Sequence, residues 1–333
     1  MFKNKIISIT GGTGSFGKKI IPELLKSNPK EIRIFSRDEM KQWYLQEKFI
    51  KQSRIKFIIG DVRDTESLGR SIKGSDYVIH AAATKIVPTA EYNPSECIKT
   101  NIFGAMNVIN QCINNNVKKV IALSTDKACN PVNLYGATKL CSDKLFVSAN
   151  FLENNSITKF SVVRYGNVMG SRGSVIPFFL KQKDSGFFHV TDKRMTRFMI
   201  TLEEAVKLVK YAFVDMSGGE IYISKIPSMK VLDIARAIKP SNKIKILGIR
   251  PGEKMHEVMI SKEDSHYTYE YKKYYKILPS LNNVYKKKSY IKKGVKVKNN
   301  FEYSSNTNTK WMTSKNIKTW LNKYIKSEDY TKF

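Results

Sequence analysis

The sequence predicts an α/β fold built on a doubly wound parallel sheet. Short, continuously apolar segments alternate with stretches of helical periodicity through the first half of the 333 residues. The first apolar segment leads directly into a glycine-rich turn, and 41% of the residues are apolar, which is enough to bury a full core. Apolar strands separated by helices are typical of βαβ units, whose parallel sheet is covered by helices on both faces.

Six apolar segments are predicted to be the strands of this sheet. They cover residues 6–10, 31–35, 55–59, 77–80, 119–123 and 160–164. Helical stretches lie between most of them, for example at residues 18–25 and 96–114. Right-handed crossovers between these strands produce the doubly wound arrangement.

Beyond residue 170 the pattern changes, and the expected elements become shorter. A helix is expected at residues 202–213, because Thr201 and Glu204 form a capping-box pattern. The C-terminal segment is rich in Lys, Asn and Tyr, so we expect it to wrap around the surface and to end in a short helix near residues 314–326.

These patterns divide the chain into two parts. Residues 1–170 are expected to form a dinucleotide-binding domain, together with a strand–helix return around residues 202–240. Residues 171–333 are expected to form mainly a smaller, interleaved substrate-binding lobe with the C-terminal wrap.

The formal net charge of +29 raises the question of nucleic-acid or acidic-membrane binding. Only 11 of the 58 basic residues are Arg, and the Lys residues spread along the whole chain, with the densest run at residues 286–298. No zinc finger, RNP signature or basic zipper accompanies them. We therefore interpret the charge as a general lysine bias and expect no nucleic-acid partner.

The cysteines and the apolar runs argue against metal and membrane classes. Cys97, Cys112, Cys129 and Cys141 include no C-x-x-C pair, so we expect no metal site, and free thiols suit a cytoplasmic protein. No apolar run approaches the ~18 residues of a membrane span, and the N-terminus shows no secretory signal. We therefore expect no membrane insertion.

The glycine-rich turn after the first strand predicts a dinucleotide-binding loop. Gly11, Gly14 and Gly17 form G-x-x-G-x-x-G at the first strand–helix junction. Glycines allow the backbone to approach a pyrophosphate, and the helix N-terminus offers free N–H groups to it. This placement predicts a Rossmann-type domain.

The tip of the second strand favours NADP over NAD. An acid usually holds the ribose 2′-hydroxyl there, but this chain has Ser36 and Arg37, followed by Lys41. A hydroxyl and a guanidinium suit a 2′-phosphate. The alternative is an exposed arginine with Asp38 or Glu39 contacting the ribose.

Two further strand ends carry polar groups. Asp61 follows the third strand and is placed to accept the adenine amino group; alternatively it is the N-cap of the next helix. His80 ends the fourth strand, where we interpret it as a hydrogen-bonded structural histidine rather than a catalyst.

The fifth strand leads into the predicted catalytic residues. Thr125 follows this strand closely, and Tyr135 and Lys139 form a Y-x-x-x-K pattern on one face of the following helix. An ammonium beside the phenol favours the phenolate, which can take a proton from a substrate hydroxyl. Asp126 and Lys127 add an acid and a base, which suit elimination of water after a transient oxidation. The alternative for this pair is a surface ion pair of little energetic value.

These motifs resemble the extended short-chain dehydrogenases/reductases, and within them the inverting UDP-N-acetylglucosamine 4,6-dehydratases of pseudaminic acid synthesis. The resemblance covers about residues 3–310. It rests on GGTGSFGK (11–18), FSRDE (35–39), AEYNP (90–94), STDKACNPVNLYGATK (124–139), RYGN (164–167), GSRGS (170–174), RMTRF (194–198) and GIRPGEK (248–254).

The resemblance implies a mechanism for the catalytic residues. Tyr135 deprotonates the sugar 4-hydroxyl while carbon 4 is oxidised by NADP⁺. Lys127 then removes the proton on carbon 5, and Asp126 protonates the leaving 6-hydroxyl. Hydride returns to carbon 6 and a proton returns to carbon 5 on the opposite face, which leaves a 4-keto-6-deoxy sugar with inverted carbon 5. The family further implies a homo-oligomer.

The resemblance also implies binding roles by position. NADP would be held by Gly11, Thr13, Gly14, Ser15, Phe16, Gly17, Ser36, Arg37, Lys41, Asp61, Val62, Ala81, Thr100, Asn101, Tyr135 and Lys139. The UDP-sugar would be held by Lys85, Asn167, Arg197, Arg250 and Glu253. His256 is expected to be structural.

Three positions depart from the usual family pattern: Thr84 replaces a Leu, Cys129 an Ala and Met199 a Trp. The alternatives within enzymes are a retaining 4,6-dehydratase or an NADP-dependent UDP-sugar epimerase. Retaining enzymes typically have Met in place of Tyr135, and an epimerase has no use for Asp126 and Lys127. The sequence therefore favours the inverting dehydratase.

Overall fold

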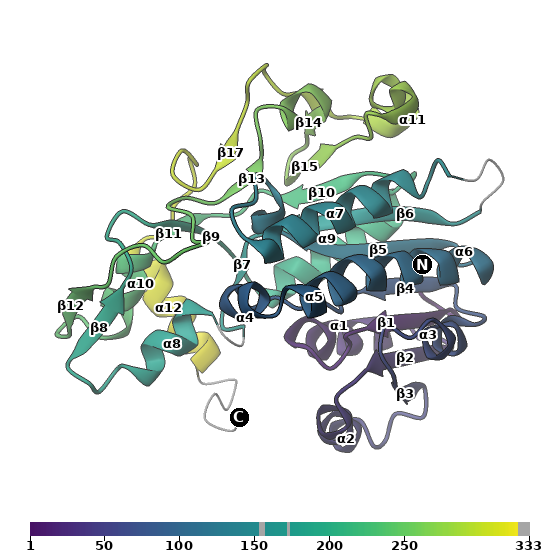
Figure 1. Ribbon diagram of the computed structural model, residues 1–333, viewed down its shortest axis with the longest axis horizontal. Helices are drawn as coiled ribbons and strands as arrows, with labels where there is room; N and C mark the ends of the chain where they lie inside the picture. The colour runs from purple at the N-terminus through teal and green to yellow at the C-terminus, as the bar shows by residue number, and fades with distance from the viewer. Residues whose placement is uncertain (153–156, 172–173, 326–333) are drawn as a thin grey trace.

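A ten-stranded sheet forms the centre of the computed structural model, which describes residues 1–152, 157–171 and 174–325 (Figure 1). The strand order is β16-β14-β15-β10-β6-β5-β4-β1-β2-β3. The strands that run parallel are β1 (Ile6–Thr10), β2 (Glu31–Ser36), β3 (Ile55–Ile59), β4 (Tyr77–His80), β5 (Lys119–Thr125), β6 (Lys159–Tyr165) and β10 (Ile221–Ser224). All six predicted strands are present, and the predicted α/β fold class is confirmed.

The winding of the sheet reverses beside β1. From β1 the chain adds β2 and β3 on one side and β4, β5 and β6 on the other. In such sheets a crevice opens at the carboxyl ends of the strands where the order reverses, and ligands bind there. The loops after β1, β4 and β5 therefore border the expected site.

Three antiparallel strands extend the far edge of this sheet. They are β15 (Tyr274–Ile277), β14 (Thr268–Glu270) and β16 (Val295–Lys296). The expected wrap of the C-terminal segment around the surface stays a prediction, although parts of this segment pair with strands. β16 joins the main sheet, and β17 (Tyr303–Ser304) pairs with β13 (Val258–Ile260).

Helices cover both faces of the sheet (Figure 1). They are α1 (Ser15–Leu25), α2 (Glu39–Lys48), α3 (Thr65–Ile72), α4 (Val87–Tyr92), α5 (Pro94–Ile98), α6 (Gly104–Asn114), α7 (Leu134–Ser148) and α9 (Leu202–Asp215). The predicted capping box of α9 is confirmed, because the Thr201 hydroxyl accepts from the Glu204 N–H and the Glu204 carboxylate accepts from the Thr201 N–H.

The helix expected at residues 96–114 is interrupted by a π-helical turn, Lys99–Phe103. The cause is Asn101, whose side chain is drawn inward. Its amide accepts from the Thr84 N–H at 2.8 Å and donates to the Thr84 carbonyl at 2.9 Å and to the Thr138 hydroxyl at 3.0 Å. Such turns often mark functional sites.

A smaller lobe lies beside the main sheet, on the left in Figure 1. Its elements are β7 (Asn167–Val168), α8 (Val175–Lys181), β8 (Phe187–Val190), β9 (Thr196–Ile200), β11 (Ser228–Lys230), α10 (Val231–Ile238), β12 (Lys243–Ile246) and α12 (Ser314–Ile325). It has its own hydrophobic cluster, which includes Met169, Phe179, Phe188, Ile234 and Ile317. The boundary expected at residue 170 stays a prediction.

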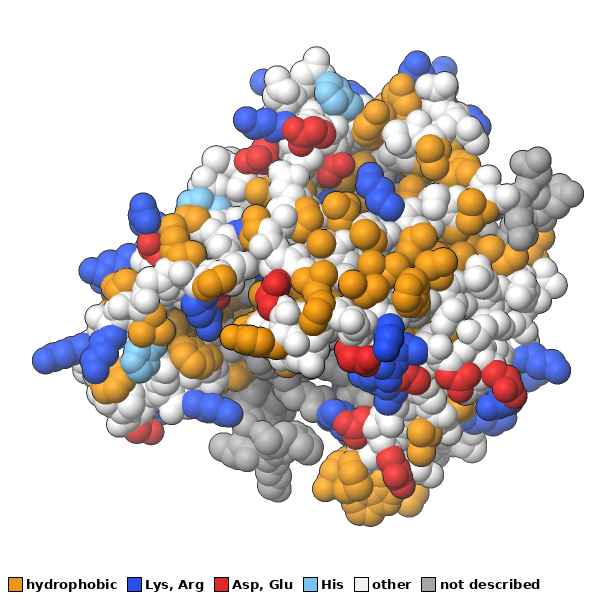
Figure 2. Space-filling model, viewed as in Figure 1, with side chains coloured by type: hydrophobic (Ala, Val, Ile, Leu, Met, Phe, Trp, Pro, Cys, Tyr) orange, Lys and Arg blue, Asp and Glu red, His pale blue; other side chains and the backbone are white. Residues whose placement is uncertain are grey.

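The expected C-terminal helix is confirmed as α12, although Lys326 lies outside the described residues. A short helix, α11 (Lys288–Ile291), precedes it. Among the described helices, none combines the length and the apolar character that a membrane crossing needs. Figure 2 shows Lys and Arg dispersed around the rim of one face, with hydrophobic side chains over α5 to α7.

Candidate active site

The loop between β1 and α1 is tight enough to require glycine. Gly11 has a φ of +67°, and a Cβ there would lie 2.7 Å from the Ala82 nitrogen and 2.8 Å from the Ala81 carbonyl oxygen. A Cβ on Gly17 would lie 2.0 Å from the Gly12 carbonyl oxygen. The backbone after β1 and the loop after β4 therefore approach closely, as a dinucleotide-binding crevice requires.

The N-terminus of α1 fits the pyrophosphate of a dinucleotide. The N-cap, Gly14, has no side chain and so makes no capping hydrogen bond to the first turn of the helix. The N–H groups of Ser15 and Phe16 begin this helix, where the helix dipole favours an anion. The residues present fit the phosphates of a nicotinamide dinucleotide.

The tip of β2 presents a guanidinium. Ser36 is buried, and its hydroxyl accepts from Thr13 at 3.2 Å and from Gln42 at 3.1 Å. The Arg37 side chain is 55% exposed and lies 3.6 Å from Asp61. Asp38 is the N-cap of α2 and accepts from the Lys41 backbone N–H at 2.9 Å and from the Lys41 ammonium. Arg37 is thus the more exposed cation at the position where a 2′-phosphate would lie.

Asp61 is not the helix N-cap that was the alternative for it. The N-cap of α3 is Asp64, which accepts from the Glu66 and Ser67 N–H groups. Asp61 instead accepts from the Arg63 N–H at 2.9 Å. Burial raises the pKa of Asp61, but the hydrogen bonds from Arg63 and the charge of Arg37 outweigh it and hold the pKa below its usual value. Asp61 therefore remains an anion beside Arg37.

His80 is structural, as expected. Its Nδ1 lies 2.8 Å from the Thr10 hydroxyl on the neighbouring strand. Burial lowers the pKa of His80 to about 3, so the ring is neutral at physiological pH.

The other side of the crevice is closely packed. Thr100 and Asn101 are buried in the π-helical turn, and Ala81 follows β4. Val62 is buried against α6. A Cβ added to Gly104 of this helix would lie 2.7 Å from the Val62 Cγ2. Of these four predicted cofactor residues, Ala81 lies beside the glycine loop, since its carbonyl oxygen would lie 2.8 Å from a Cβ on Gly11. The cofactor roles of the other three stay predictions.

The short 3-10 helix after β5, Asp126–Ala128, packs directly on the start of α7. A Cβ on Gly136 would lie 2.3 Å from the Lys127 carbonyl oxygen. The N-cap of α7, Asn133, accepts from the Gly136 N–H at 2.7 Å and donates to the Gly252 carbonyl at 2.7 Å. Tyr135 is consequently held beside Asp126 and Lys127.

Asp126 is completely buried, and only one of its oxygens is satisfied. Its Oδ1 accepts from the Thr125 hydroxyl at 3.0 Å and from the Lys127 ammonium at 3.1 Å. Its Oδ2 finds no hydrogen-bond partner among the described residues. Burial raises the pKa of Asp126, although the charge of Lys127 opposes this. A carboxyl group in this setting can keep a proton and donate it.

Lys127 lies between two carboxylates. Its Nζ is 3.1 Å from Asp126 and 3.3 Å from Glu257, and it donates to the Asn167 side-chain oxygen at 3.4 Å. Burial disfavours its charge, but Asp126 and Glu257 outweigh burial and hold the pKa of Lys127 above its usual value. Lys127 must therefore give up a proton within this cluster before it can act as a base.

Tyr135 and Lys139 lie one turn apart on α7, and both are buried. Burial raises the pKa of Tyr135 to about 12, while the charge of Lys127 and a side-chain hydrogen bond with Thr125 act to lower it. Burial also lowers the pKa of Lys139, opposed by Asp143. Lys127, rather than Lys139 alone, thus favours the phenolate.

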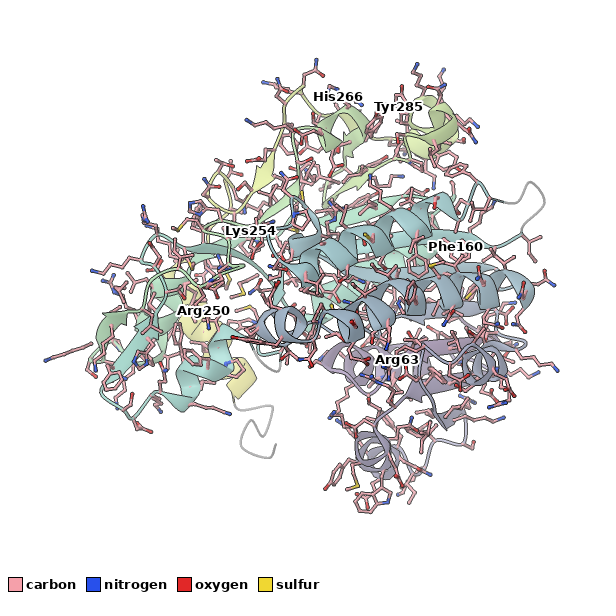
Figure 3. All side chains as sticks on the ribbon, viewed as in Figure 1. Arg63, Phe160, Arg250, Lys254, His266 and Tyr285 are labelled. Carbon is pink, nitrogen blue, oxygen red and sulfur yellow. The ribbon has the colours of Figure 1, made fainter. Side chains whose placement is uncertain are left out.

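The predicted substrate residues fall into two groups. Asn167 and Arg197 join the cluster, since Asn167 accepts from Lys127 and the Arg197 Nε lies 3.8 Å from Glu257. Arg250 and Glu253 pair with each other at 2.5 Å on the loop before β13, and the Arg250 side chain is 61% exposed (Figure 3). Lys85 is exposed after β4. Arg250 and Glu253 thus form an ion pair of their own, separate from the ion pairs of Lys127.

Glu257 was missed by sequence analysis. It is 2% exposed and lies beside Lys127, although it comes from a distant part of the chain. The only local signal is an acid directly before the apolar segment of β13. Its neighbour His256 is structural as expected, with its Nδ1 2.8 Å from the Thr196 hydroxyl.

Residues 7–279 match the family described as "Polysaccharide biosynthesis protein". The chain belongs to this family. It is 55% identical over 330 residues to a "UDP-N-acetylglucosamine 4,6-dehydratase (inverting)" of Campylobacter jejuni, covering 97% of this chain and 98% of the relative. It is 42% identical over 330 residues to a "UDP-glucose 4-epimerase" of Rickettsia typhi, covering 96% of both. The X-ray structure of Pen from Bacillus thuringiensis is similar, with a TM-score of 0.90, 38% identity and coverage of 98% of this chain and 99% of that chain. The predicted resemblance is confirmed.

The three departures from the usual pattern of this polysaccharide biosynthesis family leave Asp126, Lys127 and Tyr135 in place. The two hydrogen bonds between Thr84 and Asn101 use the backbone N–H and carbonyl of Thr84, so they do not depend on the identity of its side chain. The Cys129 carbonyl accepts at 2.5 Å from the ammonium of Lys254, which Figure 3 labels. Met199 is buried in the smaller lobe. In the resembling segment 170–174, Arg172 and Gly173 lie outside the described residues.

Proposed function

We propose that the chain is an inverting UDP-N-acetylglucosamine 4,6-dehydratase that uses NADP. The observation that carries this proposal is the buried Asp126–Lys127 pair at the carboxyl end of β5, directly beside Tyr135. An enzyme that only oxidises and reduces a sugar needs Tyr135 and Lys139 but has no use for this pair. The name of the Campylobacter jejuni relative describes the same activity.

A nicotinamide cofactor supplies reversible oxidation of the sugar when bound, so the reaction consumes no external oxidant. Within the chain, Tyr135 takes the proton of the sugar 4-hydroxyl, favoured by the charge of Lys127. Oxidation at carbon 4 makes the proton on carbon 5 acidic, and the neutral Lys127 amine removes it.

Asp126 completes the elimination. Its carboxyl group, whose pKa burial raises, takes up the proton that Lys127 gives up and donates it to the 6-hydroxyl as the carbon 6–oxygen bond breaks. Water leaves, and a double bond joins carbons 5 and 6. Carbon 6 is then reduced, and carbon 5 regains a proton on the opposite face, which inverts it. Two protons leave the sugar, from the 4-hydroxyl and from carbon 5, and two are supplied, to the 6-hydroxyl and to carbon 5, the latter from solvent. The site returns to its initial state when Tyr135 releases its proton to solvent.

The choice of NADP rests on the tip of β2. Arg37 presents an exposed guanidinium where the 2′-substituent of the ribose would lie, and Asp38 is used as a helix cap. Arg197 and Arg250 suit the UDP diphosphate, although Arg250 must turn away from Glu253 to reach it. From the family resemblance we further place the product in the synthesis of pseudaminic-acid-type sugars.

The test is to incubate the purified protein with UDP-N-acetylglucosamine, without added reductant, and to follow the mass of the nucleotide sugar. A dehydratase lowers this mass by one water. An epimerase, the activity named for the Rickettsia typhi relative, changes the configuration of the sugar but leaves its mass unchanged. Isomerisation without water loss would contradict the proposal.

A further inference from the structure

Glu257 lies beside Lys127, and hydrogen bonds hold its backbone in place. It directly precedes β13 and is 2% exposed. Its backbone N–H donates to the Ser305 hydroxyl at 2.9 Å, and its carbonyl accepts from the Ser305 N–H at 2.8 Å. The Ser304 hydroxyl also donates to this carbonyl at 3.4 Å. The backbone of Glu257 is therefore anchored independently of its side chain.

The Glu257 carboxylate interacts electrostatically with three cations. Its Oε1 lies 3.3 Å from the Lys127 Nζ and 3.8 Å from the Arg197 Nε, and Lys254 also acts on it electrostatically. Its Oε2 is buried without a hydrogen-bond partner among the described residues. Burial raises the pKa of Glu257, but the three cations outweigh burial and hold the pKa below its usual value. Glu257 is thus the group in this cluster that remains negatively charged.

Asp126 cannot hold Lys127 throughout the reaction. To protonate the leaving hydroxyl, Asp126 must carry a proton, and a neutral carboxyl group has little attraction for the ammonium that Lys127 becomes when it takes the proton from carbon 5. Glu257 is then the carboxylate that still contacts Lys127. Its distance from Lys127 nearly equals that of Asp126, 3.3 Å against 3.1 Å.

We propose that Glu257 is a positioning residue for the water-loss step: it holds the Lys127 amine in place while Asp126 carries the proton. The inference deepens the proposed dehydratase function and rests on it. The same position joins Lys127 to Arg197, one of the predicted diphosphate ligands, so one buried carboxylate connects the base to the substrate-binding lobe.

The charged and titratable groups that act on this cluster come from several elements. Those acting on Lys127 are Asp126 of the same 3-10 helix, Tyr135 of α7, Arg197 of β9, Lys254 and Glu257. Those acting on Glu257 are Lys127, Arg197 and Lys254. The negative charge of Glu257 raises the pKa of both Asp126 and Lys127. Removing that charge must lower both pKa values, and this sets the direction of the expected pH shift.

The test compares Glu257→Gln, Glu257→Asp and the full-length wild-type enzyme, with Glu220→Gln as the matched control. Glu220 is equally buried, but it accepts from Ser161, Ser217 and Gly218 at the amino end of β10, the edge of the sheet opposite to the site. Oxidation is followed in single turnovers by the absorbance of the reduced nicotinamide, and water loss by the mass of the sugar.

We expect Glu257→Gln to slow water loss by about 10²-fold, as a misplaced catalytic group does, with oxidation nearly unchanged. We also expect the pH profile of water loss in Glu257→Gln to move to lower pH. Glu257→Asp should recover part of the lost rate and should show a smaller shift of the pH profile. Glu220→Gln should leave the ratio of the two steps and the profile unchanged. An equal loss in both steps at every pH, or a Glu257→Gln profile that matches the wild type, would overturn the proposal.

A second readout does not depend on turnover. The rate at which an acylating reagent labels Lys127 is measured across pH by mass spectrometry, in the wild type and in Glu257→Gln. The labelling profile of Lys127 should move to lower pH in the variant, and an unmoved profile contradicts the role of Glu257. If the wild type shows no water loss, the proposed function fails, while the labelling still reports whether Glu257 holds Lys127.

Discussion

Replacing Lys127 with Met tests the electrostatic account of the active site most fully. Methionine keeps most of the volume of the side chain but removes the cation that lies 3.1 Å from Asp126 and 3.3 Å from Glu257. Glu257 keeps Arg197 at 3.8 Å, so one buried carboxylate, that of Asp126, loses its main counter-charge. An uncompensated buried charge costs about 3–5 kcal/mol, and we take the lower value because Asp126 can accept a proton.

The size of this effect must depend on pH. Without Lys127 the pKa of Asp126, already raised by burial, rises further in the folded protein. A carboxyl group whose folded pKa exceeds its unfolded pKa contributes stability at low pH and loses it as pH rises. We therefore expect a small loss of stability near pH 5 and about 3 kcal/mol near pH 8, or a fall of about 6 °C in Tm.

The assay is thermal unfolding of Lys127→Met and wild type at both pH values, with Lys127→Arg as the control that keeps the charge. Lys127→Arg should show little pH-dependent loss. Both variants should lose water elimination by about 10²–10⁴-fold, since neither carries the amine that acts as the base. Equal falls in Tm at both pH values, or the same pH dependence in the Arg variant, would refute the reasoning.

Three further changes probe other parts of the site. Tyr135→Phe should slow the oxidation itself by about 10²–10⁴-fold, seen as slow formation of reduced nicotinamide, and near-normal turnover would refute its role as the base. Gly17→Ala, whose Cβ would lie 2.0 Å from the Gly12 carbonyl oxygen, should weaken nicotinamide dinucleotide binding measured by calorimetry. Gly69→Ala, which meets only a movable side chain, should leave that binding unchanged. Arg37→Glu should lower the preference for NADP over NAD by roughly ten- to hundred-fold, and an unchanged ratio of the two Kd values would argue against a 2′-phosphate site at Arg37.

The elements predicted correctly are those whose signal is local. The glycine loop after β1, the capping box of Thr201 and Glu204, and the continuous apolar runs of the parallel strands each lie within a few consecutive residues. Asp126, Lys127 and Tyr135, whose catalytic roles stay predictions, likewise lie close together in the sequence, where they follow one strand and begin the next helix. Their proximity in space follows from their proximity in the chain.

The features that were missed depend on contacts between distant residues. The π-helical turn at Lys99–Phe103 is accompanied by hydrogen bonds from Asn101 to Thr84 and Thr138. The hydrophobic periodicity of the sequence does not predict such a turn. The antiparallel strands at the sheet edge are too short to show alternation. Glu257 lies beside Lys127 because of the fold around β13, so the sequence motif ends at Lys254 and the predicted substrate residues end at Glu253.

The configuration of carbon 5 in the product tests the central claim most directly. The protein is incubated with UDP-N-acetylglucosamine in D₂O, and the product is identified by NMR. We predict a 4-keto-6-deoxy sugar with inverted carbon 5 that carries solvent deuterium, because Lys127 removes the proton there and solvent supplies its replacement on the opposite face. The same ketone with carbon 5 retained would contradict the inverting assignment.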